Sequence, residues 1–192
     1  MTRHYYLTHP QVMIDPDVPV PEWGLSQIGR DRLAVLLQSK LLRGVQRIIS
    51  SGERKAIETG GIIADALGLE IEILEASHEN DRSATGFLPP PEFEAVADEF
   101  FAKPAESVRG WERAIDAQAR IVSAVEQALA GAPGKCTLFA GHGGVGTLLM
   151  CQVGGYPIQR MRDQPPGGGN YFSFGWQPAA LMHGWRACDQ NS

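Results

Sequence analysis

Three things are scarce in this sequence: cysteine, long apolar runs and positive charge. Among 192 residues there are 3 cysteines, Cys136, Cys151 and Cys188, and no two of them form a CxxC pair. An odd number of widely spaced cysteines fits reduced thiols better than a disulfide framework or a zinc knot. No stretch approaches the roughly 20 apolar residues that span a bilayer, and the N-terminus lacks a cationic segment followed by a long apolar one. We therefore expect a cytoplasmic protein that does not enter a membrane.

The charge balance excludes a further group of partners. The 17 lysines and arginines are outnumbered by 22 aspartates and glutamates, which gives a net charge of −5. This balance argues against a general binding surface for nucleic acid or anionic membranes, although it allows a local basic pocket. Any anionic ligand is therefore expected to be small.

What the sequence does contain is an alternation of short apolar runs and amphipathic segments. Its length and its 43% hydrophobic content support one sizeable core, so we expect residues 1–192 to form a single α/β domain. Runs rich in β-branched residues predict strands, and apolar residues three or four positions apart predict helices. The predicted strands are residues 5–11, 45–50, 70–74, 136–140, 170–176 and 180–187. The predicted helices are residues 26–37, 53–67, 93–100, 111–130 and 145–153.

Several details of these elements can be checked against a structure. Ser26 is expected to cap a helix and Gly68 to end the next one, while Gly60 is expected to pack closely against the sheet. The proline-rich residues 12–23 are expected to form a wall of a pocket, and residues 163–169 a flexible loop. Arg30, Asp31 and Arg32 should face water, with Arg30 and Arg120 in structural ion pairs. The expected buried face of helix 111–130 consists of Trp111, Ile115, Ala119, Val122, Val125 and Leu129.

Reactive side chains follow four of the predicted strands. His9, the pair Arg54-Lys55, Glu79 and His142 each lie at or shortly after the end of a strand. The carboxyl ends of parallel strands meet at one rim of a sheet, which is where ligands bind in open α/β folds. His142 also lies where a strand passes into a helix, and the exposed amides of a helix N-terminus favour an anion. A nucleophile, a cation, a carboxylic acid and a second imidazole together suit phosphoryl transfer.

The order of these residues resembles the histidine phosphatase superfamily, the phosphoglycerate mutase-like proteins. The family's first motif is Arg-His-Gly at the end of the first strand, where this chain has Thr8-His9-Pro10. Residues 25–30 are similar to the family's Leu-Thr-x-x-Gly-x helix start, and residues 51–59 to its Ser-x-x-x-Arg-Ala-x-x-Thr segment. The resemblance continues through residues 78–79 and 141–144. It implies a three-layer α/β/α sandwich with a mostly parallel central sheet, no metal or other cofactor, and catalysis through a phosphohistidine.

The resemblance also implies roles for the residues at the rim. His9 is the expected nucleophile, and because it must be neutral to attack, its pKa should lie near or below neutrality. A cation from the Arg54-Lys55 pair would hold the oxygens of the phosphoryl group, and His142 would bind another oxygen.

Further roles concern the leaving group and the remaining phosphate contacts. Glu79 would protonate the leaving alkoxide and then deprotonate a water molecule, which requires a raised pKa, and Asp81 is the reserve candidate. Thr8 and Gly143 complete the expected substrate-binding residues. The expected ligand is a small phosphorylated or other anionic molecule.

Three departures from the family pattern affect the expected phosphate site. Thr8 stands in place of arginine and offers one neutral donor, and Pro10 stands in place of glycine and has no amide hydrogen. The family's second arginine falls on Lys55, with Arg54 one position early. Neighbours on a helix point about 100° apart, so only one of the two is expected to reach the site. Because losing one such donor typically costs about 100- to 1,000-fold in rate, we expect slow hydrolysis of phosphomonoesters.

Two other interpretations stay open at this point. One is a catalytically impaired protein of the same fold that keeps the pocket for phosphate or a phosphorylated ligand. The other is a metallohydrolase that uses several histidines, although they show no helical HxxxH spacing. These histidines are His4, His9, His78 and His142.

A substitute cation for the phosphate site could come from Arg3, Arg82 or Arg162. Four aromatic residues are candidates for the core or for a pocket: Trp23, Phe87, Phe93 and Phe100.

Overall fold

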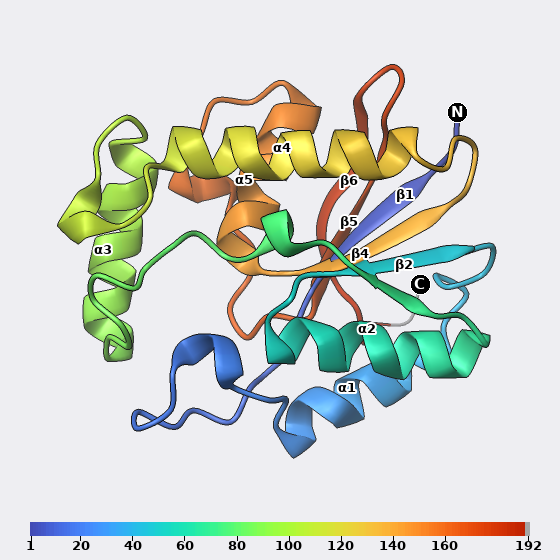
Figure 1. Ribbon diagram of the computed structural model, residues 1–192, viewed down its shortest axis with the longest axis horizontal. Helices are drawn as coiled ribbons and strands as arrows, with labels where there is room; N and C mark the ends of the chain where they lie inside the picture. The colour runs from blue at the N-terminus through green and yellow to red at the C-terminus, as the bar shows by residue number, and fades with distance from the viewer. Residues whose placement is uncertain (191–192) are drawn as a thin grey trace.

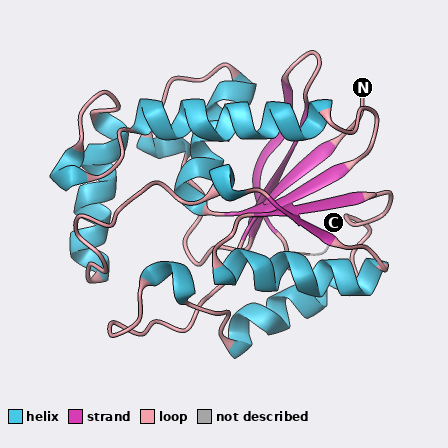
Figure 2. Cartoon of the chain, viewed as in Figure 1, coloured by secondary structure: helices cyan, strands magenta, loops and turns pink. Residues whose placement is uncertain are grey.

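A computed structural model describes residues 1–190, and a mixed sheet lies at its centre (Figures 1 and 2). The strands are ordered β3-β2-β4-β1-β5-β6. They are β1 (His4–Thr8), β2 (Arg47–Ser50), β3 (Ile71–Ile73), β4 (Thr137–Gly141), β5 (Asn170–Gly175) and β6 (Ala180–Ala187). The neighbouring strands β3, β2, β4 and β1 run parallel, whereas β5 is antiparallel to β1 and β6 is antiparallel to β5. The carboxyl ends of the parallel strands therefore share one edge of the sheet.

Helices cover both faces of this sheet. Helices α1 and α2 lie on one face and α4 and α5 on the other, while α3 stands beyond the end of the sheet (Figure 1). The helices are α1 (Gln27–Leu37), α2 (Arg54–Leu67), α3 (Pro90–Ala102), α4 (Ala114–Ala130) and α5 (Gly143–Gly154). Short 3-10 turns are η1 (Val20–Glu22), η2 (Glu75–Ser77), η3 (Val108–Gly110) and η4 (Arg160–Arg162). This arrangement confirms the predicted α/β/α sandwich. Among the described residues, no helix combines the length and apolar character that crossing a bilayer requires.

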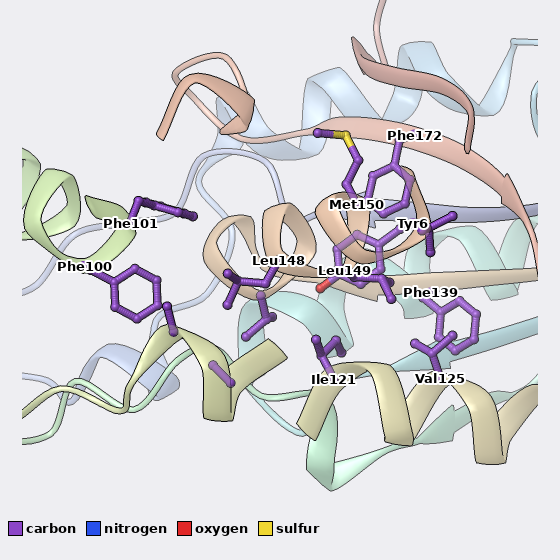
Figure 3. Packing of buried hydrophobic residues seen from close by; sticks show 14 of the residues in the cluster. Tyr6, Phe100, Phe101, Ile121, Val125, Phe139, Leu148, Leu149, Met150 and Phe172 are labelled. Carbon is purple, nitrogen blue, oxygen red and sulfur yellow. The ribbon is translucent and has the colours of Figure 1, made fainter. Parts of the chain in front are cut away.

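Side chains alternate along the strands and build a core on each side of the sheet. On β1, Tyr5 and Leu7 pack with residues of α1 and α2, whereas Tyr6 packs with residues of α4 and α5. Figure 3 shows the second of these clusters, in which the Tyr6 and Phe172 rings stack with centroids 5.4 Å apart. Because β1 is buried on both faces, the residue at its carboxyl end is held on a rigid support.

The predicted helix ends and close contacts are confirmed. The Ser26 hydroxyl accepts a hydrogen bond from the Gly29 amide at 3.2 Å, and Gly68 ends α2 with a left-handed φ of 64°. A Cβ on Gly60 would lie 3.4 Å from the Cβ of Ala140, so α2 packs directly on the sheet. Two predicted ion pairs also form. They are Arg30 with Glu58 at 2.5 Å and Arg120 with Glu112 at 2.7 Å.

The predicted start of α4 is wrong, and so is part of its predicted buried face, although Val125 and Leu129 are buried as expected. The helix begins at Ala114, and Trp111 is buried from the preceding loop instead of from the first helical turn. Counting the apolar pattern from Trp111 rotated the predicted face, so Ile115 and Ala119 are exposed. The residues that α4 buries are Ala114, Ala117, Ile121, Ala124, Val125 and Leu129. Small alanines on this face let α4 lie close to its neighbours.

Arg32 was also predicted wrongly, because it does not face water. Its guanidinium pairs with Asp189 at 2.9 Å, and its Nη1 donates to Gln11 Oε1 at 3.0 Å and to the carbonyl of Gly168 at 2.9 Å. Arg32 thereby ties down the loop of residues 163–169, which the sequence presents as flexible. Gly168 needs to be glycine here, because its φ is +63° and a Cβ would lie 2.3 Å from the carbonyl oxygen of His9.

Candidate functional site

His9 lies immediately beyond β1 and is fixed by backbone bonds on both sides. Its amide donates to the Gly141 carbonyl at 2.9 Å, and its own carbonyl accepts from the Gly169 amide at 3.0 Å. The ring Nδ1 lies 2.9 Å from the Pro10 carbonyl oxygen, which can only accept, so Nδ1 carries the proton. Burial, and secondarily His142, lower the pKa of His9 to about 3. His9 is therefore neutral near pH 7, with the Nε2 lone pair available.

His142 is the second imidazole and lies beside His9. It follows β4 and caps α5, and it is completely buried. The two rings have centroids 5.4 Å apart and lie edge to face at 68°. His142 Nε2 lies 2.8 Å from the Ser51 hydroxyl, while its buried Nδ1 has no hydrogen-bond partner among the described residues. Burial lowers the pKa of His142 as well, while the neighbouring carboxylates of Glu53 and Glu79 act in the opposite direction.

The two members of the Arg54-Lys55 pair have different surroundings. Lys55 is buried, and its Nζ donates to Glu53 Oε2 at 2.5 Å and to the Val20 carbonyl at 2.9 Å. Arg54 is exposed and pairs with Glu58 at 2.9 Å, away from the site. Lys55 is therefore the buried member of the pair, in contact with Glu53, and it is also the residue at the arginine position of the resemblance.

Glu53 is a site residue that sequence reasoning missed. Its Oε2 binds the Lys55 ammonium, while its Oε1 accepts from the Glu79 amide at 2.9 Å and lies 3.4 Å from His142 Nε2. Burial alone would raise the pKa of Glu53, but His142, the Lys55 ammonium and the Glu79 amide outweigh it and hold the pKa at about 2. The only signal in the sequence is that Glu53 follows β2 by a few residues, like the other residues of the rim.

The Glu79 carboxylate lies at the N-terminus of α5, where an anion was expected. Its Oε2 accepts from the Gly144 amide and its Oε1 from the Val145 amide, both at 3.0 Å. Burial raises the pKa of Glu79, but His142, Arg82 and the amides of Asn80 and Val145 prevail, and the net pKa is lowered. The raised pKa that the acid role requires is therefore not a property of this resting site. The reserve candidate Asp81 also has a lowered pKa, because its carboxylate accepts from the Ser83 amide.

Thr8 and Gly143 do not lie as the resemblance implied. Thr8 is fully buried, and its hydroxyl donates to Gln164 Oε1 at 2.7 Å and accepts from the Asn170 amide at 3.0 Å. The first bond joins β1 to the loop of residues 163–169 and the second joins β1 to β5, so the Thr8 hydroxyl is occupied by partners within the protein. Gly143 lies against Gln164, whose Nε2 would be 2.2 Å from a Cβ at that position. The backbone amide of Gly143 stays the expected contribution of this residue.

A cavity of about 830 Å³ lies in front of these residues. Residues 16–21 form one wall, as predicted for the proline-rich loop, and Glu53, Glu79, Arg82 and Phe87 form others. Of the site residues, Glu53 and Glu79 line this cavity, whereas His9, Lys55 and His142 are not among its lining residues. The remaining aromatic candidates lie in or against the core: Trp23, Phe93 and Phe100.

Of the candidate substitute cations, only Arg82 faces this region. It lines the cavity and lies 4.9 Å above the Phe93 ring, whereas Arg3 contacts Met182 and Arg162 lies on the Tyr156 ring. The positions of the histidines do not support the metallohydrolase interpretation either. His4 lies at the start of β1, opposite the end that carries His9, and within residues 1–190 no three His, Cys, Asp or Glu side chains are arranged to hold a metal ion.

Comparisons with known proteins give one family match and a set of solved structures with the same fold. The chain matches a family model described as the histidine phosphatase superfamily (branch 1) over residues 12–178. That segment contains Glu53, Lys55, Glu79 and His142, and it begins after His9. A comparison with curated proteins gave no significant match.

Solved structures share the fold over nearly the whole chain. A mycobacterial glucosyl-3-phosphoglycerate phosphatase in complex with inorganic phosphate has a TM-score of 0.81 at 18% identity, with 100% of both chains covered. Bacillus stearothermophilus YhfR has a TM-score of 0.78 at 22% identity, covering 100% of this chain and 98% of that one. A phosphoserine phosphatase from Entamoeba histolytica has a TM-score of 0.78 at 12% identity, covering 99% of this chain and 100% of that one. The mycobacterial phosphatase also has a structure with VO3.

Proposed function

Because the chain belongs to the histidine phosphatase superfamily, branch 1, we propose that it hydrolyses phosphomonoesters through a phosphohistidine on His9, slowly or with narrow specificity. The observation that carries this proposal is the state of the His9 ring. It is neutral, its Nδ1 proton is held by the Pro10 carbonyl, and its Nε2 lone pair is left for attack. The phosphate and VO3 complexes of the mycobacterial relative support an anion with the geometry of phosphate as the ligand.

In the proposed first step, the Nε2 lone pair of His9 forms a bond to phosphorus while the bond from phosphorus to the leaving oxygen breaks. The Pro10 carbonyl stabilises the positive charge that develops on the imidazole ring. The Lys55 ammonium and a proton on His142 Nδ1 bind phosphoryl oxygens as the group is transferred. The buried, unpartnered Nδ1 of His142 supports this assignment, because a polar atom without a partner in the described residues is suited to a ligand.

Glu79 is proposed as the acid and base of the cycle, although it is ionised at rest. A phosphoryl dianion that binds nearby raises the pKa of this carboxyl group, because like charges disfavour ionisation. Protonated Glu79 then gives its proton to the leaving alkoxide. In the second step Glu79 takes a proton from water as the water oxygen bonds to phosphorus and the bond from phosphorus to His9 breaks, which restores the neutral histidine.

A second candidate function is a protein that binds phosphate without turning over a phosphomonoester. Two observations favour it: Thr8 uses its hydroxyl within the sheet, and Pro10 has no amide hydrogen to donate. A panel of phosphomonoesters tested with wild type, His9→Gln and His183→Gln separates the two functions. His183 is the matched control, because its Nδ1 also lies close to a backbone carbonyl, at 2.8 Å, but on β6.

We expect the wild type and His183→Gln to release phosphate at equal rates and His9→Gln to release none. Phosphate binding by the wild type without release of phosphate from any ester would favour the binding protein. Equal release by His9→Gln and the wild type would contradict the proposed nucleophile.

A further inference from the structure

Glu53 occupies an unusual place for a carboxylate in a site that binds an anion. It lies between β2 and α2, it lines the cavity, and its side chain is 12% exposed. Lys55 lies behind it with a side chain that is 4% exposed. A ligand that enters from the cavity therefore meets the carboxylate of Glu53 before it meets the only buried ammonium group of the described rim.

Glu53 binds the ammonium group that the proposed phosphoryl site needs. Its Oε2 lies 2.5 Å from Lys55 Nζ, and its Oε1 accepts from the Glu79 amide at 2.9 Å. Since Lys55 Nζ otherwise donates only to the Val20 carbonyl among the described residues, Glu53 takes the charge of this ammonium. Glu79 adds a second carboxylate next to the first, bound to the N-terminal amides of α5.

We infer that Glu53 is a specificity-determining residue of this site, whose carboxylate competes with the phosphoryl group for Lys55, so that an anion binds only when Glu53 is displaced from the ammonium. This inference rests on the proposed function, since it concerns the same phosphoryl site. It would account for the slow or selective turnover proposed above, because each ligand has to provide more binding energy than the internal carboxylate does.

Glu53 also acts on His142. Its Oε1 lies 3.4 Å from His142 Nε2, and this negative charge favours the tautomer with the proton on Nε2. The phosphoryl group needs the proton on Nδ1 instead. When Glu53 leaves, the Ser51 hydroxyl, 2.8 Å from Nε2, can donate to that nitrogen and the proton can reside on Nδ1. Displacement of one carboxylate thus frees the ammonium and allows the second donor to form.

The experiment measures the affinity for inorganic phosphate by calorimetry at low ionic strength, with wild type, Glu53→Gln, Glu53→Asp and Glu75→Gln. Glu53→Gln keeps the size of the side chain and removes the charge, so phosphate should bind at least about tenfold more tightly, as expected when a like charge is removed from a binding site. Glu53→Asp keeps the charge on a shorter side chain and should give an intermediate affinity. Glu75→Gln removes an equal charge from the lining of the same cavity, at an exposed residue.

The inference holds if Glu53→Gln gains affinity and Glu75→Gln changes it by less than about twofold. Equal gains in both variants would mean that only the overall charge of the cavity matters, and would overturn it. Weaker binding by Glu53→Gln would overturn it too, because Glu53 would then serve to position Lys55. A urea unfolding curve for each variant tests whether the compared proteins are folded.

The results can distinguish a failure of this inference from a failure of the proposed function. A gain in phosphate affinity without any hydrolysis by wild type or Glu53→Gln would support the competition and contradict the phosphatase. Hydrolysis that depends on His9, together with an unchanged phosphate affinity in Glu53→Gln, would support the phosphatase and contradict the competition.

Discussion

Replacing Lys55 by methionine should destabilise the fold far more than replacing its neighbour Arg54. Lys55 and Glu53 form a pair with side chains only 4% and 12% exposed, so the change leaves a buried carboxylate without its counter-ion. Removing one partner of a buried pair costs about 3–5 kcal/mol. The pKa of Glu53 gives a second figure: its fall from the usual 4.5 to about 2 corresponds to about 3 kcal/mol. Lys55 provides part of that, so we expect a loss of about 2–3 kcal/mol at pH 7.

The pH dependence of this loss has a definite sign. A carboxyl group whose pKa is lowered by folding contributes stability above its unfolded pKa, near 4.5, and loses it as the pH falls towards its folded value of about 2. The deficit of Lys55→Met should therefore be greatest at pH 6–7 and should start to shrink below about pH 5.

Urea denaturation followed by circular dichroism at several pH values measures this deficit. Arg54→Met is the matched control, because Arg54 has an exposed side chain in a surface pair and should lose less than about 1 kcal/mol. If Lys55→Met lost no more stability than Arg54→Met, or if its deficit did not shrink in acid, the pair of Lys55 and Glu53 would not stabilise the fold as argued.

Three further predictions concern the other residues of the site. The NMR signals of the His9 ring should show no titration between pH 8 and 5, and a midpoint near 6.5 would contradict this. Because the histidine of the unfolded chain is protonated at higher pH than the folded one, the fold should become less stable as the pH falls below about 6.5. Glu79→Gln should slow hydrolysis of alkyl phosphates by about 100- to 10,000-fold but hydrolysis of p-nitrophenyl phosphate much less, since that leaving group needs no proton; equal effects on both would argue against an acid. Thr8→Arg should lower the free energy of unfolding by at least about 2 kcal/mol without raising phosphatase activity, because the buried hydroxyl joins β1 to β5; faster hydrolysis would show that position 8 can reach the substrate.

The sequence was sufficient to predict the frame of the site. His9 and His142 follow two strands that are neighbours in a parallel sheet, and parallel strands place their carboxyl ends together whatever the sequence between them. The residue types and their order then led to the prediction that two imidazoles, a cation and a carboxylate lie at the same rim.

Directions of side chains could not be predicted in the same way. Residues 54 and 55 are adjacent on α2, so composition gives no reason to prefer either, and only the packing of α2 on the sheet turns Lys55 inward. Thr8 was expected at the substrate, but the alternation along β1 and the bonds to Gln164 and Asn170 direct it into the sheet. A long side chain such as that of Arg32 can bind a distant loop, which no local pattern reveals.

The charge state of the site depended on contacts across the chain. Glu79 was expected to have a raised pKa, and burial does raise it, but His142, Arg82 and the amides of Asn80 and Val145 reverse the direction. Glu53 gave no signal beyond its position after β2, because a single carboxylate near a helix start is common on protein surfaces. Its role follows only from the contacts with Lys55, Glu79 and His142.

The most direct test of the account is to trap the phosphoryl group on the protein. Wild type, His9→Gln and His183→Gln are mixed with a labelled phosphomonoester and quenched with alkali, and the labelled peptide is identified. The account predicts a phosphoryl group that is stable in alkali and lost in acid, located on His9, present in His183→Gln and absent from His9→Gln. An ester hydrolysed by the wild type without such a label, or a label that persists in His9→Gln, would contradict it.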